Sequence, residues 1–184
     1  MKPPVHVALS WSWFTWHPGD TKKRTEAALV GAGVNLPDLD RSVYVIRLAG
    51  DFCVLYPGGD ESPTVYIGEG DFQGRIDKHR QWASELAPLI GRRKFQVGVA
   101  TPRVNNCLDA YMDCEAVLLQ RFAERFGIAP LWNKQLEKRR FEHHEYSTRS
   151  VDYALCKRSG AKYKWAVRPM KSSVFHASYG KGGG

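Results

Sequence analysis

Short apolar runs bounded by turn residues recur within the first hundred positions of the chain. Four of these runs are rich in β-branched and aromatic residues, a composition typical of strands. They are SVYVIRL at residues 42–48, FCVLY at 52–56, TVYIG at 64–68 and FQVGVA at 95–100. The first two are joined by a short turn and the third follows a loop, which indicates a mainly antiparallel sheet.

The apolar spacing becomes helical after Asp71, which is a plausible N-cap. The apolar positions of this expected helix are Ile76, Ala83, Leu86 and Ile90. A further helix is expected after Asn105 or Asn106, with Gly127 as its stop. Its apolar face would be formed by Leu108, Tyr111, Leu118, Phe122 and Phe126.

The two ends of the chain are less regular. LSWSWFTW alternates like a strand, TKKRTEAALVGAG resembles a short helix, and residues 134–155 are expected to be partly helical. The order of elements predicts an α+β fold, a small mainly antiparallel sheet flanked by helices. We expect an N-terminal extension at residues 1–40, a core at 41–134, and a basic extension at 135–184 that ends in a disordered Gly-rich tail.

Charge is distributed unevenly between these parts. Residues 1–133 carry 15 Lys and Arg against 15 Asp and Glu, whereas residues 134–184 carry 12 against 4. The whole net charge of +8 therefore lies in the last part of the chain. A basic segment of this kind favours a polyanionic partner such as nucleic acid, although a solvated tail that improves solubility is the alternative.

The apolar runs and the cysteines indicate in which cellular compartment the protein is expected. The chain contains neither an apolar run long enough to span a membrane nor a recognisable export signal. None of its four cysteines forms a C-x-x-C pair, which makes a structural zinc site improbable. Scattered cysteines favour buried free thiols in a reducing environment, so we expect a cytoplasmic protein without membrane association.

The glycine-rich stretch VYIGEGDFQGRIDKHR, residues 65–80, invites comparison with phosphate-binding loops. Its glycines follow the spacing G-x-G-x-x-x-G, one position longer than the dinucleotide-binding fingerprint, and no Walker motif is present. A nucleotide cofactor is therefore disfavoured.

Side chains of the same stretch offer another interpretation. Arg75 and His79 are four residues apart and so share a helix face, where both could meet one phosphate. Tyr66 lies on the strand that leads into this helix, and its phenol can donate to a phosphate oxygen. A surface Arg and His beside a core Tyr is the alternative.

Glu115 interrupts the apolar face of the second expected helix. A carboxylate in such a place is costly unless it is paired or binds a cation. It could pair with an internal Arg, or it could hold a hard divalent ion such as Mg²⁺. Asn133, in the pair WN, carries no signal by itself.

Taken together, these elements resemble the pattern of GIY-YIG nucleases. In chain order they are VYV at 43–45, YIG at 66–68, the Arg75 and His79 pair, Glu115, and Asn133. The resemblance covers about half the chain. VYV replaces GIY, so its glycine is missing while Tyr44 is kept. The insertion between the two tyrosines is similar to that of the restriction-endonuclease branch.

The resemblance implies a GIY-YIG-like core that hydrolyses DNA phosphodiester bonds with one Mg²⁺ or Mn²⁺ ion. Glu115 would hold the metal, Arg75 would stabilise the phosphate, and Asn133 would orient the site. Tyr44 and Tyr66 would flank the attacking water, with Tyr44 favoured as its proton acceptor. His79 would hydrogen-bond to Tyr44 or to the phosphate.

Double-stranded DNA is the expected partner, and a palindromic site would require a homodimer or two successive nicks. The expected DNA-binding residues are Lys78, Arg139, Arg140, Lys157, Arg158, Lys162, Lys164 and Arg168. A sequence-specific enzyme of restriction, phage or mobile-element type is favoured. A structure-specific repair or recombination nuclease and a non-catalytic nucleic-acid-binding module are the alternatives.

Overall fold

A four-stranded antiparallel sheet forms the centre of the protein, in the strand order β2-β7-β3-β6. Its strands are β2 (Ser12–Trp16), β3 (Val43–Leu48), β6 (Thr64–Glu69) and β7 (Phe95–Ala100). The computed structural model describes residues 3–49, 52–90 and 94–155. The α+β class with a mainly antiparallel sheet flanked by helices is confirmed.

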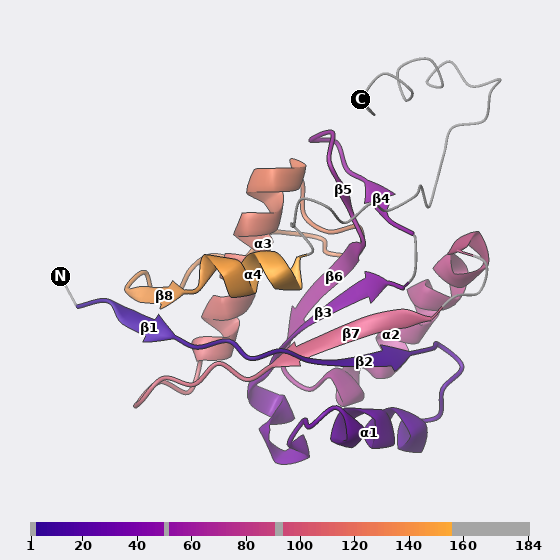
Figure 1. Ribbon diagram of the computed structural model, residues 1–184, viewed down its shortest axis with the longest axis horizontal. Coiled ribbons are helices and arrows are strands. Elements are labelled where there is room, and N and C mark those ends of the chain that lie inside the picture. Colours follow the sequence, from indigo (N-terminus) through magenta and orange to yellow (C-terminus); the bar gives the residue numbers. More distant parts are fainter. Residues whose placement is uncertain (1–2, 50–51, 91–93, 156–184) are drawn as a thin grey trace.

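Helices cover both faces of this sheet (Figure 1). One face packs against α1 (Lys22–Gly31) and α2 (Phe72–Leu86), the other against α3 (Ala110–Phe126) and α4 (Thr148–Ala154). The short 3₁₀ helices are η1 (Leu36–Arg41) and η2 (Ala87–Ile90). Because side chains alternate along a strand, Tyr44 and Ile46 join the core under α2, while Val43 and Val45 join the core under α3.

The expected strand at residues 52–56 is wrong in extent and in partner. Only β4 (Val54–Leu55) is formed, and it pairs with β5 (Glu61–Ser62) in a separate two-stranded ribbon. It cannot join β3, because β6 and β7 already occupy both edges of that strand. Tyr56 instead closes a turn by donating its backbone N–H to the carbonyl of Asp60.

Residues 1–40 are more than an appendage to the core. β2 pairs along its whole length with β7 and so forms an edge of the central sheet. β1 (Val5–Val7) runs parallel to β8 (His144–Tyr146), which ties the beginning of the chain to the region after Asn133. A boundary at residue 40 would therefore separate β2 from the sheet to which it belongs.

The caps of the two long helices agree only partly with expectation. Asp71 caps α2 as predicted, its carboxylate accepting from Gln73 N–H at 2.8 Å, and Gly127 ends α3 in the left-handed conformation. However, α3 begins at Ala110 with Asp109 at its N-cap position, so neither Asn105 nor Asn106 caps it. The intervening residues form a turn closed by a bridge between Val104 and Cys107, which leaves Leu108 exposed.

Beyond α3 the expected partial helix is short. In the described residues that follow α3, only α4 is an α-helix, and β8 precedes it as a strand. Of the cysteines in the described residues, Cys53 and Cys114 are buried as expected, whereas Cys107 is partly exposed. Cys156 lies outside the described residues.

Candidate active site

A cavity of about 780 Å³ lies beside β6, where α2 and α3 approach the same edge of the sheet. The expected site residues that line it are Tyr66, Arg75, His79, Glu115 and Asn133. Tyr44 lies behind this wall, with its hydroxyl 2.8 Å from Nε2 of His79. The six residues, which are spread over 90 positions of the sequence from 44 to 133, thus meet in one place.

The register of β3 and β6 brings the two tyrosines together. Tyr44 is paired with Gly68 and Ile46 with Tyr66, so both phenol rings extend from the same face of the sheet. Their ring centroids are 5.9 Å apart in a stacked arrangement. A Cβ atom at residue 68 would lie 2.6 Å from Tyr66 and 2.7 Å from Tyr44, so only glycine leaves room for both rings.

Tyr44 and His79 form a buried hydrogen-bonded pair. Tyr44 is fully buried and His79 is only 3% exposed. Burial, reinforced by the charges of Arg75 and Lys78, lowers the pKa of His79 to about 4. Burial, together with Tyr66, raises the pKa of Tyr44 well above its ordinary value. Both groups are therefore neutral near pH 7, and Tyr44 is a poor candidate for the proton acceptor that the sequence favoured.

Tyr66, in contrast, faces the cavity. Burial and the neighbouring Glu115 raise its pKa, while the charge of Arg75 acts in the opposite direction. Because its ring is less buried than that of Tyr44, Tyr66 is the tyrosine that a substrate or water in the cavity would meet first.

Arg75 stands in the first turns of α2 and points toward the sheet edge. Its Nη2 donates to Oε1 of Glu69 at 2.7 Å, and its side chain is 41% exposed. Gly70, in the left-handed conformation with φ of 76°, brings the chain past this guanidinium between β6 and α2. Arg75 is thus held in place by one carboxylate while the rest of its guanidinium stays accessible to an anion.

Glu115 projects from α3 into the same cavity and is half-buried. Burial and the nearby carboxylates of Glu69 and Glu137 raise its pKa to about 7. Among the described residues Glu115 forms no salt bridge, although the charges of Arg75 and Arg140 lie near enough to lower its pKa in part. A half-buried carboxylate beside two others is electrostatically unfavourable, and a bound cation would relieve this repulsion.

The cation would need ligands besides protein side chains. In the described ranges, no three His, Cys, Asp or Glu side chains converge closely enough to form a metal site by themselves. Mg²⁺ commonly binds one or two carboxylates and keeps water and substrate phosphate in its shell. The residues around Glu115 therefore fit an ion of this kind.

Asn133 closes the open edge of β6. Its side-chain Oδ1 accepts from Ile67 N–H at 2.9 Å, and its Nδ2 donates to the Ile67 carbonyl at 2.7 Å. These bonds satisfy backbone groups that an edge strand would otherwise leave unpaired. Asn133 therefore holds the strand that carries Tyr66, in keeping with the orienting role expected for it.

Asp113 is an anchor that the sequence did not reveal. Its buried carboxylate accepts from Arg139 Nε at 3.0 Å and from the backbone N–H groups of Arg140 and Phe141 at 2.7 and 2.9 Å. Tyr146 adds a hydrogen bond from its hydroxyl at 3.2 Å. These contacts fasten the segment after Asn133 across α3, next to the cavity.

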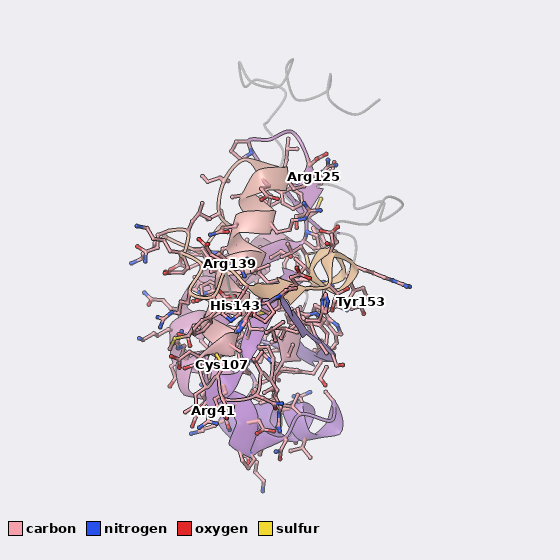
Figure 2. The ribbon with its side chains drawn as sticks, turned by 90° about the vertical axis from the view of Figure 1, so that its left-hand side faces the viewer. Arg41, Cys107, Arg125, Arg139, His143 and Tyr153 are labelled. Carbon is pink, nitrogen blue, oxygen red and sulfur yellow. The ribbon has the colours of Figure 1, made fainter. Side chains whose placement is uncertain are left out.

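The expected DNA-binding residues fall into different environments. Lys78 is exposed and lines the cavity, and Arg140 is exposed beside a smaller hollow of about 170 Å³ that it shares with Glu115. Arg139 is instead engaged by Asp113 and by the carbonyls of Phe141 and His144, so we no longer assign it a DNA contact. Figure 2 looks onto the face that carries Arg139. Lys157, Arg158, Lys162, Lys164 and Arg168 lie outside the described residues.

The adjacent histidines His143 and His144, which are prominent in the sequence, do not join this site. Both line another hollow, of about 360 Å³, with residues of the loop that precedes α3.

In comparisons with known proteins, no family model, curated protein or solved structure matches this chain. Within the part of the chain that the structure describes, no helix has the length and apolar character needed to cross a membrane.

Proposed function

We propose that this protein is a metal-dependent endonuclease that hydrolyses phosphodiester bonds of double-stranded DNA. The observation that carries the proposal is the convergence of Tyr66, Arg75, His79, Glu115 and Asn133 on one cavity, with Tyr44 directly behind it. This is the set of side chains by which the sequence resembles GIY-YIG nucleases.

Arg75 would bind the scissile phosphate and stabilise the charge that develops in the transition state. Its fixed position supports this role, because a donor that is already oriented needs no reorganisation during the reaction. The guanidinium keeps accessible donors while Glu69 holds one of its nitrogen atoms. Lys78, at the same wall, would add a positive charge for the neighbouring phosphates.

Glu115 would hold Mg²⁺ or Mn²⁺. When bound, the ion would stabilise negative charge on the scissile phosphate and on the leaving oxygen. Glu115 must be deprotonated to act as a ligand, so its raised pKa makes metal binding depend on pH near neutrality.

Tyr66 would hydrogen-bond to the attacking water, because it is the tyrosine that faces the cavity. Tyr44 would lie behind Tyr66 and away from the water, as a buried phenol whose position is fixed by His79. A neutral His79 can accept a hydrogen bond from the Tyr44 hydroxyl, which an imidazolium could not. Asn133 would keep β6, and with it Tyr66, in register.

The test is incubation of plasmid DNA with and without Mg²⁺, followed by sequencing of the new ends. Discrete fragments indicate a sequence-specific enzyme, preference for branched substrates indicates a repair or recombination nuclease, and binding without cleavage indicates a non-catalytic module. Glu115→Ala should abolish cleavage and keep DNA binding. Glu85→Ala, at an exposed position of α2, is the matched control and should cleave normally.

A further inference from the structure

Four aromatic rings form a ladder from the core of the protein to the cavity. Tyr44 and Tyr66 are stacked at 5.9 Å and 27°, Tyr66 and Trp82 at 6.3 Å and 29°. Trp82 and Trp132 continue the series at 5.4 Å and 20°. Tyr44 is fully buried and Trp82 is 8% exposed, whereas Trp132 is partly exposed and lines the cavity. The ladder therefore ends on an indole at the cavity wall.

The last ring of the ladder is held firmly in place. Trp132 donates its backbone N–H to the carbonyl of Val65 at 3.0 Å, and the next residue, Asn133, binds both backbone groups of Ile67. One residue earlier, Leu131 N–H donates to the Tyr56 hydroxyl at 3.2 Å. These bonds fix the backbone of Trp132, and its ring is stacked on Trp82, so it loses little conformational freedom when it stacks on a ligand.

The rest of the cavity carries both carboxylates, those of Glu69, Glu115 and Glu137, and cationic side chains. Its volume of about 780 Å³ lies within the range of small-ligand pockets, about 300–1,000 Å³. Arg75, Lys78 and Lys134 supply positive charge along the same wall that Trp132 completes. An aromatic face next to cationic side chains is the combination by which proteins bind an unstacked nucleotide, the base on the ring and the phosphate on the cations.

We propose that Trp132 stacks on a nucleobase adjoining the scissile phosphate, which leaves the base stack of the DNA and enters the cavity. This assignment rests on the proposed nuclease function, since Arg75 defines where the scissile phosphate lies. Bases inside an intact duplex already stack on their neighbours, so only an extruded base can offer its face to Trp132. The cost of extrusion is lowest where the base is mismatched.

The test uses substrates whose cut position has first been mapped on plasmid DNA. Each nucleotide on either side of the cut is replaced in turn by an abasic nucleotide, and binding is measured with the cleavage-deficient Glu115→Ala protein. Loss of the base removes its stacking on Trp132 and also the cost of extruding it, and only the first of these depends on residue 132. At one position the change in affinity caused by the abasic nucleotide should therefore be less favourable, by about fivefold or more, with Trp132 present than when Trp132→Leu is added, which is the lower end of base–aromatic stacking.

Three further readouts separate stacking from a purely structural role of Trp132. Trp132→Phe should keep most of the sensitivity to the abasic nucleotide. 2-Aminopurine at the identified position, which is quenched by stacking in the free duplex, should stay quenched in the complex when an aromatic ring occupies residue 132 and become brighter with Trp132→Leu. A mismatch at that position should tighten binding. Trp11→Leu, at a partly buried tryptophan that does not line the cavity, is the matched control and should retain all of these responses.

The outcomes distinguish this assignment from the function on which it rests. Cleavage with no position whose effect depends on Trp132 would overturn base stacking and leave the nuclease proposal standing. Failure to cleave any DNA would overturn both. If a free mononucleotide bound to the cavity as tightly as DNA does, the site would serve a soluble nucleotide, and the assignment would also be overturned.

Discussion

The ring of Tyr44 lies across Gly68, its cross-strand neighbour in β6, so closely that a Cβ atom there would stand 2.7 Å from the Tyr44 hydroxyl. The missing side chain is what allows the phenol to reach Nε2 of His79. The glycine of the YIG motif thereby determines where a tyrosine of the other motif points.

Gly68→Ala should therefore damage both stability and activity. The added methyl group would also lie 2.6 Å from Tyr66, and neither ring can move without disturbing a packed core. We expect a loss of about 1–3 kcal/mol in the free energy of unfolding, typical of overpacking. Chemical denaturation measures the loss, and plasmid cleavage should fall because Tyr44 and Tyr66 are displaced.

Gly31→Ala is the control for this substitution. Nothing lies within 4 Å of the position where its Cβ atom would stand, and it ends α1 without a left-handed conformation. Its stability should be unchanged or slightly higher. If both alanine variants unfold like the unaltered protein, the close packing of Tyr44 over Gly68 is contradicted.

Glu115→Gln should make the protein more stable, in a manner that depends on pH. The pKa of Glu115 is raised from 4.5 to about 7, so the folded state favours the protonated carboxyl. The stabilisation that comes from this preference for the proton is fully present below pH 4.5, declines as pH rises, and is lost above about pH 7. Glutamine avoids this loss, and because Glu115 is partly exposed we expect a gain of about 1–3 kcal/mol above pH 7.

Thermal unfolding between pH 4 and 8.5 measures this difference, which should grow with pH and level off near 7.5. Equal curves for the two proteins at all pH values would show that Glu115 is not destabilised by its surroundings. In the unaltered protein, apparent Mg²⁺ affinity should rise about tenfold per pH unit below 7 and level off above it, because a proton competes with the ion.

The sequence predicted those parts of the site that depend on one element at a time. Arg75 and His79 share a face of α2 because of helical spacing, and Asp71 caps that helix as its side chain suggests. Both features follow from a local period or a cap, which the order of residues expresses directly. The hydrogen bond between His79 and Tyr44, one of the two contacts that the resemblance implied for His79, is also present, although it joins α2 to β3.

Other features that depend on distant elements were missed. The strand expected at residues 52–56 failed because its intended partner, β3, already has neighbours on both edges. Asp113 looked like an ordinary polar residue near the beginning of a helix, since its partners lie 26 to 33 residues further on. Burial of Tyr44, which argues against its role as a base, is likewise a property of the assembled sheet and helix.

Asp113→Asn should cost more stability than any exposed substitution of the same kind. Its carboxylate is fully buried and accepts four hydrogen bonds from Arg139, Arg140, Phe141 and Tyr146. Removing its charge leaves the partly buried guanidinium of Arg139 without its counter-charge, which costs about 3–5 kcal/mol. Urea unfolding measures the loss. Asp77→Asn, at a side chain that is 83% exposed, should change stability by less than about 0.5 kcal/mol.

The contribution of Asp113 should also disappear in acid. Burial by itself would raise its pKa, but Arg139 and the two backbone N–H groups lower it below the ordinary value of 3.8. A carboxyl whose pKa is lowered on folding stabilises the protein above its unfolded pKa and ceases to do so as pH falls through the folded one. The difference between Asp113→Asn and the unaltered protein should therefore shrink below pH 3.8. A difference that persists unchanged there would mean that the charge of Asp113 contributes nothing.

Arg75→Ala should reduce the cleavage rate by about 10²-fold or more, as expected for the loss of a positioned donor to a developing oxyanion. Arg75→Lys keeps the charge but not the planar fork that binds Glu69 and would bind the phosphate, so it should restore only part of the rate. Arg24→Ala, at an exposed side chain of α1, is the matched control. Single-turnover rates with saturating DNA separate this effect from weaker binding. A rate for Arg75→Ala close to that of the control would remove Arg75 from the reaction and leave it only as the partner of Glu69.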